Sequence, residues 1–348
     1  MAYELEEAKK LVVAAGKKLV ESGLIARTWG NVSARISDTQ FVITPSGRAY
    51  ETLTPEEVVV VNIEDCSYEG EIKPSSEKGV HAAAYRHHPT VDFVIHTHQK
   101  AATIVSITGM EIRNVYKEFQ PVLGNKVPCA DYAMSTTNSL RKKVETCIMM
   151  NPGCRAIMLM HHGTLCMGDT YEQAFEIADA LEKCCQRVIK DNYLRHSWAE
   201  TYSDEGKRNF YLKKNGAVAM PERICDLGSS VRNGKTFSLT VGGETIDVDL
   251  ETGLGITGIA PKCAKIHKAI YDSQNCSIIK HVTDPDVIAV SCTGEDMIPM
   301  IDDFAQIAGV DVKNRPWIDG DTDACAKDIA KAMDSRNAVS YTHLTLPT

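Results

Sequence analysis

Two histidines stand two residues apart in the stretch VDFVIHTHQKAA, residues 91–102. In a β-strand alternate side chains point to the same face, so His96 and His98 can present two imidazoles to one metal ion. An isolated pair of this kind more often consists of polar residues that hydrogen-bond to neighbours or to water. Further ligands are needed before the pair indicates a metal site.

A third histidine, His162, ends a second apolar run, CRAIMLMHHG. If its strand lies beside that of His96 and His98, the three imidazoles form an open zinc site of the catalytic type, in which substrate or water completes the coordination. Glu77 is the candidate acid–base group for such a centre. The fragments GNVS, TPSG and PSSE add hydroxyl, amide and backbone N–H groups that can hold a phosphate without a lysine, although each alone usually forms a turn.

The elements that would position these residues alternate along the chain. Helical spacing of apolar residues predicts helices at 4–24, 75–88 and 169–194. Short apolar runs bounded by turn residues predict strands at 31–37, 40–45, 57–64, 91–98 and 154–163. Helices interleaved with strands favour an α/β fold with layers around a sheet.

Composition narrows the class of protein. The chain has 348 residues, 43% of them hydrophobic, which is enough for two domains. Its formal net charge is −8 and it has no cluster of Lys and Arg near aromatic residues, so neither nucleic acid nor an anionic membrane is an expected partner. It has no apolar run of roughly 20 residues, and its twelve cysteines include no CxxC pair, so we expect a cytoplasmic protein.

The order of five fragments is more specific than any one of them. GNVSARI, FVITPSGRAYETLTPEEVVVVN, KPSSEKGVHAAAY, VIHTH and LMHHGTLCMG follow one another as in the class II aldolase/adducin family, and the chain resembles most closely the L-fuculose-phosphate aldolases. The resemblance covers about residues 5–195. It implies a three-layer α/β/α sandwich around a mixed, mostly antiparallel sheet, and a homotetramer with active sites between subunits.

The resemblance also implies roles for individual residues. His96, His98 and His162 match the zinc ligands, Glu77 matches the catalytic acid/base, and His161 falls beside a ligand position. The matched phosphate pocket consists of Asn31, Ser46, Gly47, Ser75 and Ser76. Zinc would act as a Lewis acid that stabilises the enediolate formed when a ketose 1-phosphate is cleaved to dihydroxyacetone phosphate and an aldehyde.

One position departs from the pattern. The fuculose-phosphate aldolases carry a tyrosine that protonates the aldehyde oxygen, but the aligned residue here is Lys117, with Tyr116 one residue earlier. In a β-strand, residues one position apart point to opposite faces of the sheet. Tyr116 is therefore a candidate proton donor, and the sugar stereochemistry stays open.

Three other functions remain. A sugar-phosphate epimerase or dehydratase of the same family would use the same zinc and phosphate pocket. An adducin-like interaction module would not need the histidine triad and Glu77. A zinc hydrolase would leave the phosphate-binding fragments without a role.

Residues 229–339 repeat the pattern of the first half. KIHKAIYDSQNCSIIKHVTDPDVIAVSCTG parallels GVHAAAYRHHPTVDFVIHTHQKAATIVSITG, which pairs His267 with His81 and His281 with His96. Thr283 and Cys263 stand where His98 and Glu77 stand, so we expect a degenerate, truncated copy without catalytic activity. The predicted organisation is a catalytic domain at 1–200, a linker at 201–228, the partial copy at 229–339 and a tail at 340–348 from a cloning or assembly junction.

Overall fold

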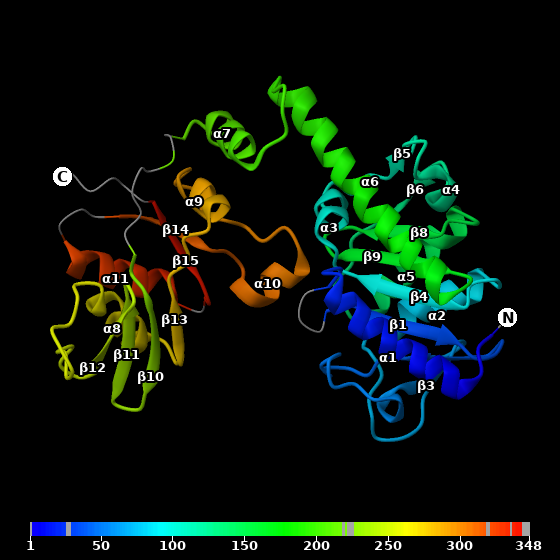
Figure 1. The fold of residues 1–348 in the computed structure, drawn as a ribbon, viewed down its shortest axis with the longest axis horizontal. Coiled ribbons are helices and arrows are strands. Elements are labelled where there is room, and N and C mark those ends of the chain that lie inside the picture. The colour runs from blue at the N-terminus through cyan, green and yellow to red at the C-terminus, as the bar shows by residue number, and fades with distance from the viewer. Residues whose placement is uncertain are drawn as a thin grey trace. The chain divides into compact units, whose positions relative to one another are not determined.

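The computed structural model describes residues 2–25, 29–217, 220, 226–317, 321–334 and 336–342. It divides into two compact units, Met1–Asn192 (unit 1) and Tyr193–Thr348 (unit 2), which appear in Figure 1 as the blue-to-green and the green-to-red parts of the ribbon. None of the helices in the described ranges is long and apolar enough to cross a membrane.

Unit 1 is built on a seven-stranded sheet with the strand order β3-β2-β1-β4-β9-β8-β7. The strands are β1 (Asn31–Arg35), β2 (Gln40–Ile43), β3 (Val59–Asn62), β4 (Phe93–Thr97), β7 (Cys129–Ala130), β8 (Ala156–Leu159) and β9 (Gly163–Gly168). Neighbouring strands run antiparallel except β7 and β8, which are parallel. The central strands β4 and β9 pair along their whole length, which places the two histidine-bearing segments side by side.

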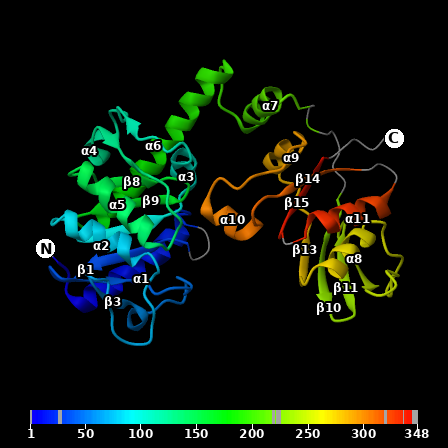
Figure 2. The same ribbon diagram turned by 180° about the vertical axis from the view of Figure 1, so that it is seen from behind.

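Helices cover both faces of this sheet. On one face, α2 (Lys78–His87) and α5 (Asn138–Met150) pack on a cluster that includes Val94 and Leu165, and Figure 2 shows both helices on this side. On the other face, α1 (Leu5–Glu21), α3 (Lys100–Ser106) and α6 (Tyr171–Ser197) pack on a cluster that includes Phe93 and Ile95. Successive residues of β4 thus face opposite helical layers, as strand geometry requires. The predicted three-layer α/β/α sandwich is confirmed.

Three short elements connect α3 to β7 at one edge of unit 1. They are β5 (Ile112–Arg113), α4 (Gln120–Leu123) and β6 (Lys126–Val127), and β5 pairs with β6. A single turn of 3-10 helix, Pro55–Glu57, precedes β3.

Unit 2 contains a four-stranded antiparallel sheet and a separate parallel pair. The sheet has the order β12-β11-β10-β13, and β14 pairs with β15. The strands are β10 (Ser229–Asn233), β11 (Thr236–Val241), β12 (Glu244–Asp249), β13 (Ile278–Lys280), β14 (Lys313–Pro316) and β15 (Val339–Thr342). The helices are α7 (Asp204–Lys214), α8 (Ala264–Ser273), α9 (Pro285–Ser291), α10 (Asp302–Ala308) and α11 (Thr322–Ala332).

A buried polar cluster recurs in the two units. In unit 1 the Ser33 hydroxyl lies 2.6 Å from His81 Nδ1 and 2.7 Å from Tyr85 Oη. In unit 2 the Ser230 hydroxyl lies 2.7 Å from His267 Nδ1 and 2.9 Å from Tyr271 Oη. Each cluster joins the first strand of a sheet to the helix packed on it. The recurrence extends the sequence similarity to specific contacts, although the identification of unit 2 as a degenerate copy stays a prediction.

The predicted linker and tail contain regular structure. Helix α7 lies within 201–228 and begins after Ser203, whose hydroxyl accepts a hydrogen bond from Gly206 N and so caps the helix. Polar composition alone did not reveal this helix. Within the predicted tail, residues 340–342 belong to β15, and residues 343–348 lie outside the described residues.

Candidate active site

Three imidazoles meet at the end of the central strands of unit 1. Nε2 of His96 lies 3.0 Å from Nε2 of His98 and 3.2 Å from Nε2 of His162. A tetrahedral zinc ion with bonds of about 2.0–2.1 Å to nitrogen would hold such nitrogens about 3.3 Å apart. Three nitrogens at this spacing therefore form a candidate ligand set for one metal ion.

Local backbone geometry brings His162 to the strand of the other two. His96 lies opposite Leu165 of β9, and the turn between β8 and β9 holds His161 at φ +61°. This left-handed conformation is uncommon for a residue with a side chain. After His162, a Cβ on Gly163, the first residue of β9, would lie 2.4 Å from the Thr97 carbonyl oxygen, so only glycine fits. The two special positions turn His162 toward the cluster and leave His161 against Tyr132.

The tautomer of His96 suits a metal ligand. Its Nδ1 lies 2.8 Å from the carbonyl oxygen of Thr164, an atom that can only accept a hydrogen bond. Nδ1 therefore carries a proton, so Nε2 is the ring nitrogen that can coordinate a metal ion once it is unprotonated. Metal-binding histidines commonly use the second ring nitrogen in this way, which fixes the ring orientation. The donor set thus fits a divalent ion that favours nitrogen ligands.

Glu77 adds a carboxylate to the cluster. It lies at the N-terminus of α2, where its backbone N–H donates to the Ser75 hydroxyl at 3.2 Å. Its Oε2 lies 3.0 Å from His96 Nε2, and its Oε1 lies 3.1 Å from His162 Nε2. Burial raises the pKa of the Glu77 carboxyl, but interactions with His96 and His162 outweigh it and hold the pKa well below its usual range. Glu77 is therefore a carboxylate at neutral pH and can act as a base.

A chain of hydrogen bonds connects Glu77 to the core. The Asn31 side-chain amide donates to Glu77 Oε2 at 3.4 Å, and Asn31 Oδ1 lies 2.5 Å from His81 Nε2. An amide oxygen only accepts, so His81 carries its proton on Nε2 and accepts from Ser33 at Nδ1. Burial, together with the nearby His96, lowers the pKa of His81 to about 3. A neutral His81 thus fixes the direction in which Asn31 presents its amide group to Glu77.

The residues matched to a phosphate pocket lie on two loops joined by backbone hydrogen bonds. Ser46 N donates to Lys73 O, and Ser75 N donates to Thr44 O, so the TPSG and PSSE segments run together. Gly47 has φ +70°, a turn conformation that favours glycine. The PSSE loop and Asn31 thus contact Glu77, and the TPSG loop is bonded to the PSSE loop.

The sequence model for the family described as "Class II Aldolase and Adducin N-terminal domain" matches residues 10–189 and, in a second segment, residues 234–343. The chain belongs to this family. Unit 1 is accordingly an enzyme unit of the class II aldolase type, a carbon–carbon lyase.

Individual members of the family resemble unit 1. A 5-deoxy-D-ribulose 1-phosphate aldolase of Bacillus thuringiensis is 33% identical over 183 residues, which are 52% of this chain and 84% of that protein. An L-fuculose phosphate aldolase of Escherichia coli K12 is 33% identical over 172 residues, which are 49% of this chain and 78% of that protein. A solved L-fuculose 1-phosphate aldolase is 28% identical and matches with a TM-score of 0.50 over 60% of this chain and 96% of its own.

Another family relative has a name that denotes a different reaction. The L-ribulose-5-phosphate 4-epimerase UlaF of Salmonella paratyphi B is 30% identical over 191 residues, which are 51% of this chain and 82% of that protein. Similarity at this level therefore extends to an enzyme named for epimerisation as well as to aldolases.

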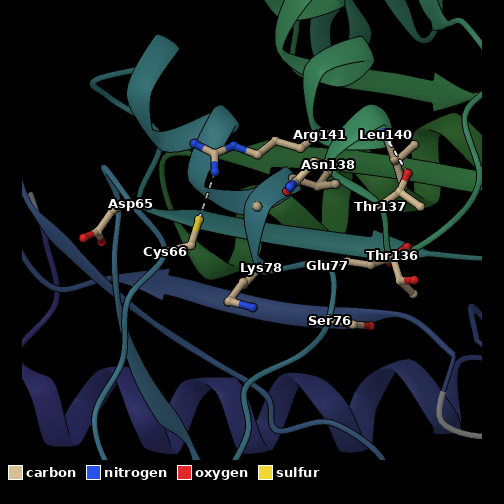
Figure 3. Close-up of a pocket in the computed structure, with 12 residues that line it drawn as sticks. Asp65, Cys66, Ser76, Glu77, Lys78, Thr136, Thr137, Asn138, Leu140 and Arg141 are labelled. Carbon is tan, nitrogen blue, oxygen red and sulfur yellow. Dashed lines mark hydrogen bonds between the residues drawn. The ribbon is translucent and has the colours of Figure 1, made fainter.

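A pocket of about 220 Å³ opens beside Glu77, between the N-terminal ends of α2 and α5. Ser76 lines it together with two cations, Lys78 and Arg141 (Figure 3). One of the dashed lines in Figure 3 joins Arg141 to Cys66, a contact of 3.6 Å. Sequence reasoning did not select Lys78, although it follows Glu77 within the fragment KPSSEKGVHAAAY. It also missed Arg141, which is far from the matched fragments in sequence and comes near through the packing of α5 against α2.

Tyr116, the candidate proton donor, has its contacts elsewhere in unit 1. Its hydroxyl donates to Asp191 Oδ2 at 2.8 Å, and the Arg187 guanidinium lies 4.1 Å from its ring centre. Burial and the Asp191 carboxylate raise the pKa of Tyr116 to about 12. Both partners belong to α6, so the structure does not group Tyr116 with Glu77, and its predicted role stays a prediction.

Proposed function

We propose that unit 1 is a zinc-dependent aldolase that cleaves a ketose 1-phosphate, such as L-fuculose 1-phosphate, to dihydroxyacetone phosphate and an aldehyde. The observation that carries this proposal is the position of Glu77, whose two carboxylate oxygens lie 3.0 and 3.1 Å from two of the three clustered imidazoles. An acid–base group beside a metal-type ligand set suits a reaction that moves a proton at the carbon next to a carbonyl. The names of the fuculose and deoxyribulose phosphate aldolases support the substrate class.

In this proposal His96, His98 and His162 hold the ion. A bound zinc ion would supply Lewis acidity to the substrate carbonyl. In the condensation direction the ionised carboxylate of Glu77 removes a proton from the hydroxymethyl carbon of dihydroxyacetone phosphate. In the cleavage direction the C4 hydroxyl gives up its proton as the C3–C4 bond breaks, and Glu77, having taken up a proton, delivers it to that carbon. Asn31, held by neutral His81, keeps Oε2 of Glu77 directed at the cluster.

The phosphate group would bind to the TPSG and PSSE loops. Ser46, Ser75 and Ser76 supply hydroxyl groups, and Gly47 allows close approach of the backbone. Lys78 and Arg141 add positive charge at the adjoining pocket. We expect the unphosphorylated ketose to be a poor substrate, because these hydrogen-bond donors contribute most to the binding free energy when a charged oxygen accepts from them.

We propose that the chain works as a cytoplasmic homo-oligomer, a tetramer by family resemblance, with each active site completed by a neighbouring copy. Tyr116 would then serve a neighbouring site rather than the Glu77 of its own chain. Size measurement in solution tests the assembly. Loss of turnover in Tyr116→Phe with metal content unchanged would support the tyrosine assignment, and full turnover would remove it.

We propose that unit 2 is a non-catalytic, degenerate copy with a packing or assembly role. Cys263 occupies the N-cap position of α8 that Glu77 occupies on α2. Thr283 stands where unit 1 has the ligand His98, so unit 2 lacks at these positions both the carboxylate base and one imidazole. The His162→Ala full-length chain should therefore have no lyase activity, whereas residues 1–200 should retain it if they assemble. Appreciable activity in the His162→Ala chain would contradict this role.

A panel of phosphorylated ketoses tests the proposed function. The zinc-loaded chain is incubated with L-fuculose 1-phosphate, 5-deoxy-D-ribulose 1-phosphate, their unphosphorylated ketoses and L-ribulose 5-phosphate, and the release of dihydroxyacetone phosphate is followed enzymatically. Cleavage of a ketose 1-phosphate, lost in Glu77→Gln, supports the aldolase. Conversion of the 5-phosphate to its epimer without triose release would instead support the epimerase, the alternative suggested by the UlaF relative.

A further inference from the structure

Asn31 lies at the start of β1, where its side chain is committed to contacts within the protein. The family resemblance places this residue in the phosphate pocket. In the structure Asn31 is 5% exposed, its Nδ2 lies 3.4 Å from Glu77 Oε2, and its Oδ1 lies 2.5 Å from His81 Nε2. At most one N–H of the amide is left for a ligand, so most of its hydrogen-bonding capacity is used by other side chains.

The carboxylate of Glu77 fixes the orientation of this amide. An ionised carboxylate accepts hydrogen bonds and cannot donate them, so the group that faces Oε2 is an amide N–H. A reversed amide would place its oxygen against the carboxylate and would leave the buried charge without this donor. The amide oxygen of Asn31 must therefore face His81, which donates to it from Nε2.

The same donor direction continues into the core. With its proton on Nε2, His81 accepts at Nδ1, so the Ser33 hydroxyl 2.6 Å away is the donor. Ser33 Oγ lies 2.7 Å from the hydroxyl of Tyr85, and burial raises the pKa of Tyr85, so that hydroxyl keeps its proton and donates to Ser33. A continuous chain of hydrogen bonds thus runs in one direction, from Tyr85 to Glu77.

Unit 2 contains the buried Tyr–Ser–His cluster but not the amide. Gly228 stands two residues before Ser230, at the place that Asn31 has in unit 1. The ring nitrogen Nε2 of His267 instead lies 2.8 Å from the backbone carbonyl oxygen of Leu227. The cluster is therefore common to both units, whereas the amide that connects it to a carboxylate belongs to the unit that has the histidine triad. This contrast points to a role of the amide at the carboxylate rather than in the fold.

We propose that Asn31 is a positioning residue for Glu77, that His81 acts through it, and that this chain contributes to turnover rather than to phosphate binding. The inference rests on the proposed aldolase function, in which Glu77 is the base. Held by the amide, Oε2 of Glu77 stays directed at His96, 3.0 Å away. Loss of the amide would leave the side chain of Glu77 able to adopt other rotamers, and a displaced base transfers a proton more slowly.

A split between binding and turnover tests this role. Asn31→Leu has nearly the same shape and no hydrogen-bonding group. The zinc-loaded variant should bind inorganic phosphate within about three-fold of the unmodified chain in calorimetry, while kcat for ketose 1-phosphate cleavage falls at least about ten-fold. Ser46→Ala is the comparison, because it removes a hydroxyl from the TPSG loop and should weaken phosphate binding about ten-fold. A loss of phosphate affinity in Asn31→Leu as large as that in Ser46→Ala, or an unchanged kcat, would overturn the proposal.

The position of the proton on His81 gives a readout that needs no turnover. Nitrogen-15 NMR distinguishes the neutral tautomers of histidine, and we expect the His81 proton on Nε2. In Asn31→Leu that N–H loses its acceptor, so the proton should move to Nδ1, where Ser33 Oγ can accept it. His267 is the control within the same spectrum, because its acceptor is the Leu227 carbonyl and its proton should stay on Nε2.

The two readouts separate this inference from the proposed function. If the unmodified chain neither cleaves a ketose 1-phosphate nor exchanges a hydrogen of dihydroxyacetone phosphate, the aldolase proposal fails, while the spectrum still tests the hydrogen-bond chain. A proton on Nδ1 of His81 in the unmodified chain, or one that stays on Nε2 in Asn31→Leu, would contradict the positioning role. If Asn31→Leu fails to fold, His81→Phe takes its place and should lower kcat at least about ten-fold with phosphate affinity unchanged.

Discussion

Oε2 of Glu77 lies 3.0 Å from Nε2 of His96, the nitrogen that the Thr164 carbonyl leaves free for a ligand. The carboxylate therefore points at the position where the three imidazoles converge. Glu77 is buried, with 8% of its surface exposed, and a buried carboxylate needs positive charge or hydrogen-bond donors nearby. The arrangement gives one side chain access both to the metal position and to a substrate bound beside it.

The histidine cluster should hold about one divalent ion per chain. His96→Ala and His98→Ala each remove a ligand from an open site, so we expect the bound metal to fall at least about ten-fold. The matched control is His281→Ala, because His281 has the register position of His96 in unit 2 and should not change the metal content. Elemental analysis after gel filtration measures the result. Equal metal content in all four proteins would contradict the ligand assignment.

Glu77→Gln should separate binding from turnover. The amide keeps the shape of the side chain but cannot take up a proton, so only proton transfer is lost. We expect metal content and the affinity for inorganic phosphate to change by less than about three-fold, while kcat falls by at least about 10²-fold. Calorimetry and steady-state kinetics give the two readouts. A variant with near-normal kcat would show that another group carries the proton.

Gly163→Ala should damage the metal site without touching a ligand. The added Cβ would lie 2.4 Å from the Thr97 carbonyl oxygen and 3.0 Å from Cδ2 of His98, so strand β9 must shift. Gly258→Ala is the control, since its Cβ would meet only Ile246, at 3.8 Å. Zinc affinity, measured by competition with a chelator, should fall at least about ten-fold in Gly163→Ala and stay unchanged in Gly258→Ala.

The low pKa of His81 predicts that the stability of the folded chain depends on pH. Its pKa is about 3 in the folded chain, because burial disfavours the charged form, and about 6.5 when unfolded. Below about pH 6.5 the unfolded chain binds a proton at His81 that the folded chain does not bind. The contribution of neutral His81 to the free energy of unfolding is therefore complete above about pH 6.5. It falls as the pH decreases toward about 3. The loss from this one group is about 1.4 kcal/mol at pH 5.5.

Urea unfolding of the metal-free chain at pH 7.5 and 5.5 measures this loss. His81→Gln lacks the titrating group, so its free energy of unfolding should change less between the two pH values, by about 1.4 kcal/mol. Metal-free protein is used for both, so that zinc release does not enter the difference. The same pH dependence in both proteins would show that His81 is protonated in the folded chain.

Much of unit 1 could be predicted because its signals are local. A single sequence is enough to recognise the spacing of His96 and His98 in one strand, the alternation of apolar residues and the order of the fragments. The Thr164 carbonyl that orients His96 depends on strand pairing, and the approach of Arg141 to the pocket beside Glu77 depends on helix packing, neither of which the motifs encode. Tyr116 shows the same limit, because a one-residue offset in sequence cannot tell which neighbours a side chain meets.

Unit 2 shows a different limit. The aligned His267 and His281 could be recognised because the residue types persist, yet helix α7 was missed because its polar residues resemble those of a linker.

Solvent exchange into dihydroxyacetone phosphate tests the central claim most directly, because it does not depend on which aldehyde the enzyme uses. If Glu77 returns a proton to the hydroxymethyl carbon during cleavage, then by microscopic reversibility it also removes one from the product. In D₂O the zinc-loaded chain should exchange one carbon-bound hydrogen of dihydroxyacetone phosphate, as seen by ¹H NMR, and Glu77→Gln and His96→Ala should not. Absence of exchange with the folded, zinc-loaded chain, or exchange unchanged in Glu77→Gln, would contradict the account.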